Sequence, residues 1–112
     1  MNLDELVQSI PDSENALREE LACLIVEWKR SAEPIEKLDY LVDKWHGNVW
    51  FQKIDDSNAF YRNWCKFKKE AISGINGMTV NERLYVFGLL ELWGESNDEF
   101  RANLRNKVKV HV

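Results

Sequence analysis

The residue types that most often carry catalysis or bind metals are scarce in this sequence. It contains two histidines, His46 and His111, and two cysteines, Cys23 and Cys65. Their spacing matches no zinc-binding pattern, and neither cysteine has a base assigned to it that would activate the thiol. We interpret His46, at the end of an expected helix, as a partner of the helix dipole rather than a general base. The sequence therefore predicts a non-catalytic protein with no metal and no cofactor.

Acidic residues are more numerous, but their arrangement also argues against catalysis. Asp55 and Asp56 are adjacent and stand where a helix is expected to begin, and such acids commonly cap helices. The oxygen-rich spacing of a calcium loop is absent, and no glycine-rich loop follows a strand to hold a phosphate. Either of these acids, or Ser57, can cap a helix over about residues 58–73.

Charge is distributed unevenly along the chain. Residues 1–58 contain 13 acidic and 6 basic side chains, whereas residues 59–112 contain 6 acidic and 9 basic side chains. An acidic half can attract a basic protein and a basic half can attract nucleic acid, but solvated helix surfaces explain the difference equally well. The basic helix near 58–73 could hold phosphates, yet Trp64 and Phe67 follow its core-facing stripe and would not stack on bases. Nucleic-acid binding is therefore only an alternative hypothesis.

Hydrophobic periodicity predicts that residues 1–112 form one compact all-α domain of five to seven helices. Apolar residues recur at three- and four-residue intervals, and prolines, glycines and N-cap residues separate these runs. The segment 48–56 can form a short helical turn or an extended link, and the tail 108–112 a frayed end or a short extended piece. The expected helices are a first one that Pro11 ends, then 14–30, 34–46, 58–73, 78–93, and a last one begun by a Ser96–Glu99 capping box.

One stretch, Met78–Trp93, is apolar on almost every side. Thr79 and Glu82 have the spacing of a capping box at its start, and Gly94 is placed to end it. Gly88, in the middle, disfavours a helix by about 1 kcal/mol relative to alanine, which suggests a close backbone contact there. We therefore expect a buried central helix near residues 79–93, with the other helices packed around it.

The chain shows no sign of a membrane or a secretory destination. Its N-terminus is acidic and lacks the apolar run of a signal peptide. No stretch approaches the roughly 20 apolar residues that span a bilayer. Together with two unpaired cysteines, these features favour a cytoplasmic protein with reduced thiols.

Two stretches, Met78–Trp93 (MTVNERLYVFGLLELW) and Trp50–Trp64 (WFQKIDDSNAFYRNW), resemble immunity proteins of contact-dependent growth inhibition systems. Those are small cytoplasmic bacterial proteins that bind and neutralise one cognate toxin, often a nuclease. The resemblance covers about the second half of the chain, and its motif residues are structural, so it transfers no catalytic residues. It implies that this chain covers the active site of a toxin domain, which we expect to be a basic nuclease. The alternatives are a nucleic-acid-binding regulator and a small protein-interaction adaptor, and the oligomeric state stays open.

A basic partner would find its best match between Glu36 and Asp56. This segment joins an acidic helical stripe to a Trp–Phe pair and then to two further acids, in a region rich in aromatic side chains. The competing hypothesis places Trp50 in the core and leaves Asp55 or Asp56 as a helix cap. Asp39 and Asp43 are expected on the outer face, where charge reversal should leave folding intact. The predicted partner-binding residues are Asp39, Asp43, Trp50, Asp55 and Asp56.

Overall fold

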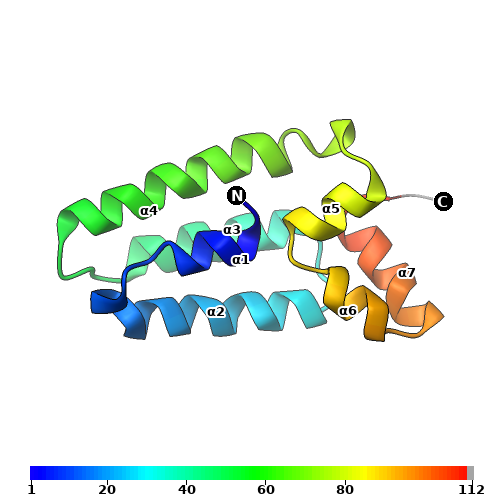
Figure 1. Ribbon diagram of the computed structural model, residues 1–112, viewed down its shortest axis with the longest axis horizontal. Coiled ribbons are helices and arrows are strands. Elements are labelled where there is room, and N and C mark those ends of the chain that lie inside the picture. Colours follow the sequence, from blue (N-terminus) through cyan, green and yellow to red (C-terminus); the bar gives the residue numbers. More distant parts are fainter. Residues whose placement is uncertain (111–112) are drawn as a thin grey trace.

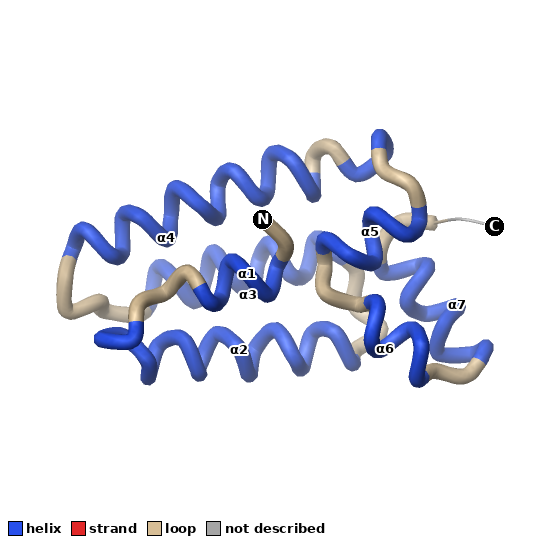
Figure 2. Tube along the Cα trace, in the orientation of Figure 1, coloured by secondary structure: helices blue, strands red, loops and turns tan. Residues whose placement is uncertain are grey.

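Seven α-helices make up most of residues 1–110, the part of the chain that the computed structural model describes (Figures 1 and 2). No residue of this part lies in a strand, so the prediction of an all-α fold with five to seven helices is confirmed. Three short elements, η1 (Asp12–Glu14), the π-helical turn η2 (Lys68–Ile72) and η3 (Ile75–Gly77), connect the helices. The helices are α1 (Leu3–Gln8), α2 (Asn15–Arg30), α3 (Ile35–Asn48), α4 (Ile54–Phe67), α5 (Val80–Val86), α6 (Leu90–Glu95) and α7 (Asp98–Lys107).

The four N-terminal helices form an elongated bundle, and the three C-terminal helices close one of its ends. In Figure 1, α2 and α4 run along opposite edges, with α1 and α3 between them. The connection from α3 to α4 lies at the left end of this view, and α5, α6 and α7 lie at the right end. The molecule is correspondingly long, with principal extents of 45 × 25 × 19 Å. The α3–α4 connection is therefore remote from the C-terminal helices.

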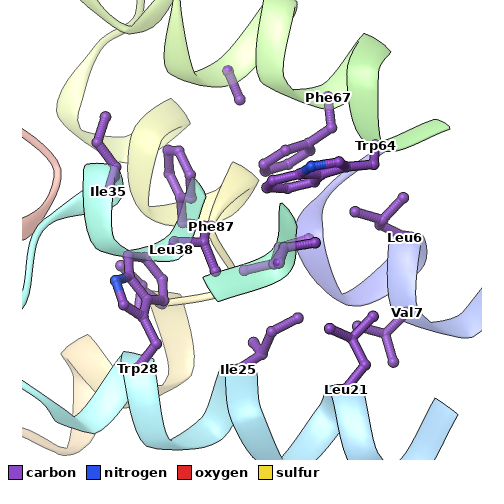
Figure 3. Close-up of a cluster of buried hydrophobic side chains, with 14 of the residues drawn as sticks. Leu6, Val7, Leu21, Ile25, Trp28, Ile35, Leu38, Trp64, Phe67 and Phe87 are labelled. Atoms are coloured by element: carbon purple, nitrogen blue, oxygen red, sulfur yellow. The ribbon is translucent and has the colours of Figure 1, made fainter. Parts of the chain in front are cut away.

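Aromatic residues from α2, from α4 and from the segment that follows α5 meet in the core (Figure 3). The ring of Phe87 lies 5.9 Å from that of Trp28 and 5.6 Å from that of Phe67, and Trp64 stacks on Phe67 at 5.7 Å. All four side chains are buried. Edge-to-face and offset aromatic contacts add about 0.5–1.5 kcal/mol per pair to the free energy of burial. This cluster joins α2 and α4 to the segment that follows α5.

The expected buried central helix near 79–93 is wrong, because this segment forms two short helices at one end of the molecule, where Val80, Tyr85 and Leu90 are exposed. The Thr79–Glu82 capping box is present, but α5 ends at Val86, α6 begins at Leu90, and Gly88 between them has φ +68°. Glycine adopts this left-handed conformation without the steric cost that other residues incur. A Cβ at Gly88 would also lie 2.5 Å from Asp4 Oδ2 and 2.8 Å from Lys29 Nζ. The close contact inferred at this glycine exists, but it accompanies a break between two helices.

Three other expectations about helix ends need correction. Helix α4 begins at Ile54, after an N-cap, Lys53, that makes no side-chain capping bond, so Asp55 and Asp56 lie in its first turn and do not cap it. Helix α7 is capped by Asn97, whose side chain accepts from the backbone N–H of Phe100 at 2.8 Å, and the predicted Ser96–Glu99 box is wrong. The segment 48–56 divides: Asn48 completes α3, 49–53 is non-helical, and 54–56 start α4.

The start of the tail, at residues 108 and 109, is packed against the rest of the chain. Val108 is buried and Arg83 donates from Nη1 to the carbonyl oxygens of Val108 and Lys109, both at 3.1 Å. A frayed end is therefore wrong for residues 108 and 109. His111 and Val112, which belong to the same sequence-based expectation, lie outside the described residues.

A fully buried lysine, Lys107, fastens α7 to the C-terminal end of α2. Its Nζ donates to the carbonyl oxygens of Trp28 at 2.7 Å and Glu33 at 2.6 Å, and to Ser31 Oγ at 3.3 Å. The ammonium also lies 4.5 Å from the centroid of the Trp28 ring. A cation is favourable here because the last carbonyl groups of a helix carry partial negative charge. With its donor sites occupied by backbone and hydroxyl oxygens, Lys107 has a structural role.

Burial lowers the pKa of Lys107 from 10.5 to about 8, although the Glu33 carboxylate acts in the opposite direction. Between these two pH values the unfolded chain binds more protons than the folded chain, so the free energy of unfolding should rise with pH across the window. We expect a rise on the order of 1–3 kcal/mol. Urea denaturation of the wild type and of Lys107→Met at several pH values measures it. An equal rise in both proteins would contradict this role for Lys107.

Candidate protein-interaction surface

Trp50 is the most exposed large apolar side chain of the described residues. It lies in the α3–α4 connection and is 92% exposed, whereas Trp28, Trp45 and Trp64 are buried. Its neighbours Val49 and Phe51 are both partly buried and pack against the core. The backbone at Val49 is extended, with φ −112° and ψ 158°, and successive side chains of an extended chain point to opposite sides. Directing Val49 and Phe51 inward therefore directs Trp50 outward.

The connection is held in place on both sides of Trp50. The Phe51 ring lies 6.3 Å from that of Trp45 and 6.4 Å from that of Phe60. The backbone N–H of Gln52 donates to Glu14 Oε1 at 2.6 Å, and Glu14 is itself buried. These contacts join the connection to α3, to α4 and to the end of η1. The exposure of Trp50 is thus imposed by its packed neighbours.

A second apolar side chain and an open hollow adjoin Trp50. Ile54, at the start of α4, is 71% exposed. The hollow has a volume of about 670 Å³ and is lined by residues from Gly47 to Ser57, including Trp50, Phe51 and Ile54. We call this region, residues 47–57, the Trp50 corner. Exposed aromatic and aliphatic groups beside a concave surface are typical of protein-interaction sites.

The charged residues at the corner are mainly acidic. Asp55 is exposed and Asp56 is half-buried, both in the first turn of α4, and Lys53 precedes them. None of these three side chains forms an ion pair among the described residues. The structure therefore brings together three of the predicted partner-binding residues, Trp50, Asp55 and Asp56. The hypothesis that Trp50 belongs to the core is wrong.

The other two predicted residues, Asp39 and Asp43, lie elsewhere and are already engaged. Trp64 Nε1 donates to Asp43 Oδ1 at 2.7 Å, and Lys68 Nζ is 3.2 Å from both oxygens of Asp43 and 3.6 Å from Asp39 Oδ1. These contacts connect α3 to α4 and η2, near the end of α4 that is remote from the Trp50 corner. Asp43 is exposed and Asp39 is partly exposed, as expected for an outer face, but these contacts argue against the expectation that charge reversal there leaves folding intact.

These contacts and burial shift the pKa values of Asp39 and Asp43 in opposite directions. Burial raises the pKa of Asp39 above its usual 3.8, and the opposing attraction of Lys68 is too small to restore it. Burial also acts to raise the pKa of Asp43, but hydrogen bonds from Trp64 and Lys68 outweigh it and hold that pKa below 3.8. Asp43 therefore stabilises the folded chain as a carboxylate, whereas ionised Asp39 opposes folding.

Asp43→Ala should lower the free energy of unfolding at pH 7 by about 1–2 kcal/mol, because the buried Trp64 indole N–H loses its acceptor. Asp39→Asn, on the same helix face, should change it by less than about 0.5 kcal/mol. Because the pKa of Asp43 is lowered on folding, its contribution is present above pH 3.8 and is lost as the pH falls below that value. Denaturant titrations at pH 7 and pH 3 measure both effects. Equal losses in the two variants would contradict this assignment.

His46 is packed among aromatic rings beside the corner. Its ring stacks on Tyr61 at 5.2 Å and on Phe60 at 5.6 Å, and its Nε2 is 3.1 Å from Ser57 Oγ. It lies in the last turn of α3, as expected for a partner of the helix dipole. Both cysteines are free thiols, and the described residues contain no group of three His, Cys, Asp or Glu side chains placed to hold a metal.

Sequence reasoning missed two features of this surface. Ile54, at the edge of the Trp50 corner, was not recognised as an exposed residue of this surface, because the helix was expected to begin four residues later. Sequence reasoning also did not identify a shallow groove between α2 and α3, lined by Leu24 and Leu41. If Val49, Trp50 and Phe51 are interpreted as an extended segment, their side chains alternate between the core and the solvent. Val49 and Phe51 then face the core, and Trp50 lies on the surface.

A scan of protein-family models, a search of curated proteins and a search of solved structures each found no match to this chain. In the described part of the structure, no helix has the length and apolar character needed to cross a membrane.

Proposed function

We propose that this chain is a non-catalytic protein-binding domain that neutralises a cognate bacterial toxin in the cytoplasm. The observation that supports the proposal is the exposed Trp50, held outward beside a hollow by side chains packed on either side of it. Tryptophan is enriched among the residues that dominate binding energy at protein interfaces. An exposed indole does not stabilise the fold of this chain. A partner that covers Trp50 gains the free energy of burying its apolar surface.

The partner class follows from the acidic half of the chain and from the resemblance to immunity proteins. Asp55 and Asp56 stand beside Trp50 without ion-pair partners among the described residues. A basic groove, such as the substrate groove of a nuclease, would bring opposite charge to them. The proposed mechanism is occlusion: the acids speed the encounter, and Trp50 supplies residence time once it is covered.

Replacing both Asp55 and Asp56 by asparagine should slow association with a basic partner several-fold at low salt and change dissociation little. The reason is that exposed charges steer diffusion over a distance that salt shortens to about 8 Å at physiological ionic strength. Stopped-flow association rates at low and high salt measure the effect. The double variant should lose most of the salt dependence seen in the wild type. An unchanged salt dependence would show that other charges guide the encounter.

Nucleic-acid binding has one observation in its favour. Arg62, Lys66 and Lys69 are exposed along one side of α4 and η2. However, Trp64 and Phe67 are buried, as expected, and Lys68 is paired with two aspartates, so no aromatic of this stripe is free to stack on bases. Tyr61, on the same helix, is exposed, but its ring already stacks on His46, so the three cations provide a weaker site than the Trp50 corner does.

Coexpression tests the proposal directly. The chain is produced with the toxin domain encoded beside its own gene, and cell growth and copurification are measured. We expect restored growth and a stoichiometric complex that survives gel filtration. In parallel, fluorescence anisotropy with labelled DNA and RNA is measured at about 50 mM and about 200 mM salt. Nucleic-acid binding with a steep salt dependence, together with no protein complex, would overturn the proposal in favour of a regulator.

A further inference from the structure

A groove between α2 and α3 continues the surface that begins at the Trp50 corner. Two adjoining hollows, of about 490 Å³ and about 310 Å³, share Glu20, Leu24 and Leu41 as lining residues. The second hollow also shares Asn48 and Val49 with the hollow beside Trp50. Leu24 and Leu41 are partly buried and form an apolar floor. The groove runs between the antiparallel helices α2 and α3, so its shape suits a third helix.

The two sides of the groove carry opposite charge. On α2, Glu20 and Glu27 are exposed seven residues apart, and on α3, Lys37 and Lys44 are exposed with the same spacing. None of these four forms an ion pair among residues 1–110. The acidic side is anchored, because Trp45 Nε1 donates to Glu20 Oε1 at 3.1 Å. The lysines lie on either side of the exposed Tyr40 ring, at 5.3 Å and 5.7 Å from its centroid.

We propose that this groove binds one amphipathic helix of the partner protein, with a leucine-like stripe on its floor, cations along the edge facing α2 and anions along the edge facing α3. The inference rests on the proposed function, because it names the part of the partner that is bound. Charge complementarity supports this occupant: a uniformly basic or uniformly acidic helix would meet like charge on one side. The lining of α2 from Glu20 to Ser31 spans about 16 Å, so the groove accommodates about three helical turns.

Three synthetic helical peptides with the same leucine stripe provide the probe. The first has lysines along one edge and glutamates along the other, the second has glutamates on both edges, and the third has lysines on both. We expect the first to bind at least about tenfold more tightly than the other two at low salt, a difference of about 1.4 kcal/mol. In a ¹⁵N–¹H spectrum, the indole signal of Trp45 should move on binding. The signal of Trp64, whose indole is bonded to Asp43 between α3 and α4, should not.

Reversing the charge of the α3 side of the groove tests which peptide the groove prefers. The double variant Lys37→Glu and Lys44→Glu makes both sides of the groove acidic, so its preference should change to the peptide with lysines on both edges. The matched control, Lys66→Glu and Lys69→Glu, makes the same charge change on α4 and η2 and should keep the wild-type preference. An unchanged preference in the first variant would overturn the proposal. So would movement of the Trp64 signal instead of the Trp45 signal, or no movement of the Trp45 signal with any peptide.

The partner complex separates this inference from the proposed function. If the wild-type chain does not bind its toxin, the proposed function fails whatever the peptides do. If Trp50→Ala abolishes copurification but the Lys37→Glu and Lys44→Glu variant retains full affinity, the proposed function holds and the groove is not used. Loss of affinity in both variants, with both proteins folded, supports the groove. Movement of the Trp45 signal on simple concentration of the free protein would instead identify a second copy of the chain as the occupant and overturn the proposal.

Discussion

Phe87→Ala should lower the free energy of unfolding by about 3–5 kcal/mol, the largest stability effect that we expect for a single substitution in this chain. Phe87 is 0% exposed, and its ring contacts Trp28 on α2 and Phe67 on α4. Removing it leaves a cavity where three segments meet, and the surrounding aromatic rings cannot collapse to fill it without losing their own contacts (Figure 3).

Equilibrium urea denaturation measures this loss as a shift of the midpoint at constant slope. Tyr85→Ala is the matched control, because Tyr85 lies on the same helix two residues earlier but is exposed. We expect the control to lose less than about 1 kcal/mol. Similar losses in the two variants would contradict the position assigned to Phe87.

Trp50→Ala should weaken binding to the partner protein by at least about 30-fold, or about 2 kcal/mol, mainly through faster dissociation. The side chain is exposed in the free chain, so its removal should change the free energy of unfolding by less than about 0.5 kcal/mol. Surface plasmon resonance with the immobilised toxin domain gives both rates. Tyr85→Ala again serves as control, since it removes an exposed aromatic at the other end of the molecule. A Trp50→Ala protein with wild-type affinity would remove this side chain from the interface.

Local signals in the sequence predicted much of the fold. The capping box of Thr79 with Glu82 is present, and the apolar stripes of α2, α3 and α4 face the core as expected. These features depend on residues within one or two helical turns of each other, so they can be recognised from the sequence alone.

The break at Gly88 could not be predicted in the same way. Phe87 and Leu89 are buried on either side of it, so the apolar pattern continues although the helix does not. In the folded chain the Asp4–Lys29 ion pair, with Nζ and Oδ1 2.7 Å apart, lies against Gly88 and leaves no room for a Cβ there. Both residues of that pair are distant in sequence, and nothing near Gly88 indicates them.

Only part of the candidate site could be predicted, because the rest also depends on contacts between residues that are distant in sequence. Spacing placed Asp39 and Asp43 on one face of α3, but only the packing of α4 determines that this face meets Trp64 and Lys68. For Trp50, composition suggested an interface and could not exclude the core. Its exposure depends on the extended backbone between α3 and α4, where a shift of one residue would exchange inward and outward side chains.

Coverage of Trp50 by a partner protein is the central claim, and ¹⁹F NMR tests it most directly. The chain is labelled with 5-fluorotryptophan at its five tryptophans, and the Trp50 signal is assigned with Trp50→Phe. In the free protein this signal should show a large solvent-isotope shift between H₂O and D₂O, because the side chain is 92% exposed. In the saturated complex with the toxin domain that shift should disappear, while the signals of buried Trp28 and Trp64 stay unaffected by the change of solvent. A Trp50 signal that keeps its full isotope shift in the saturated complex would contradict the account.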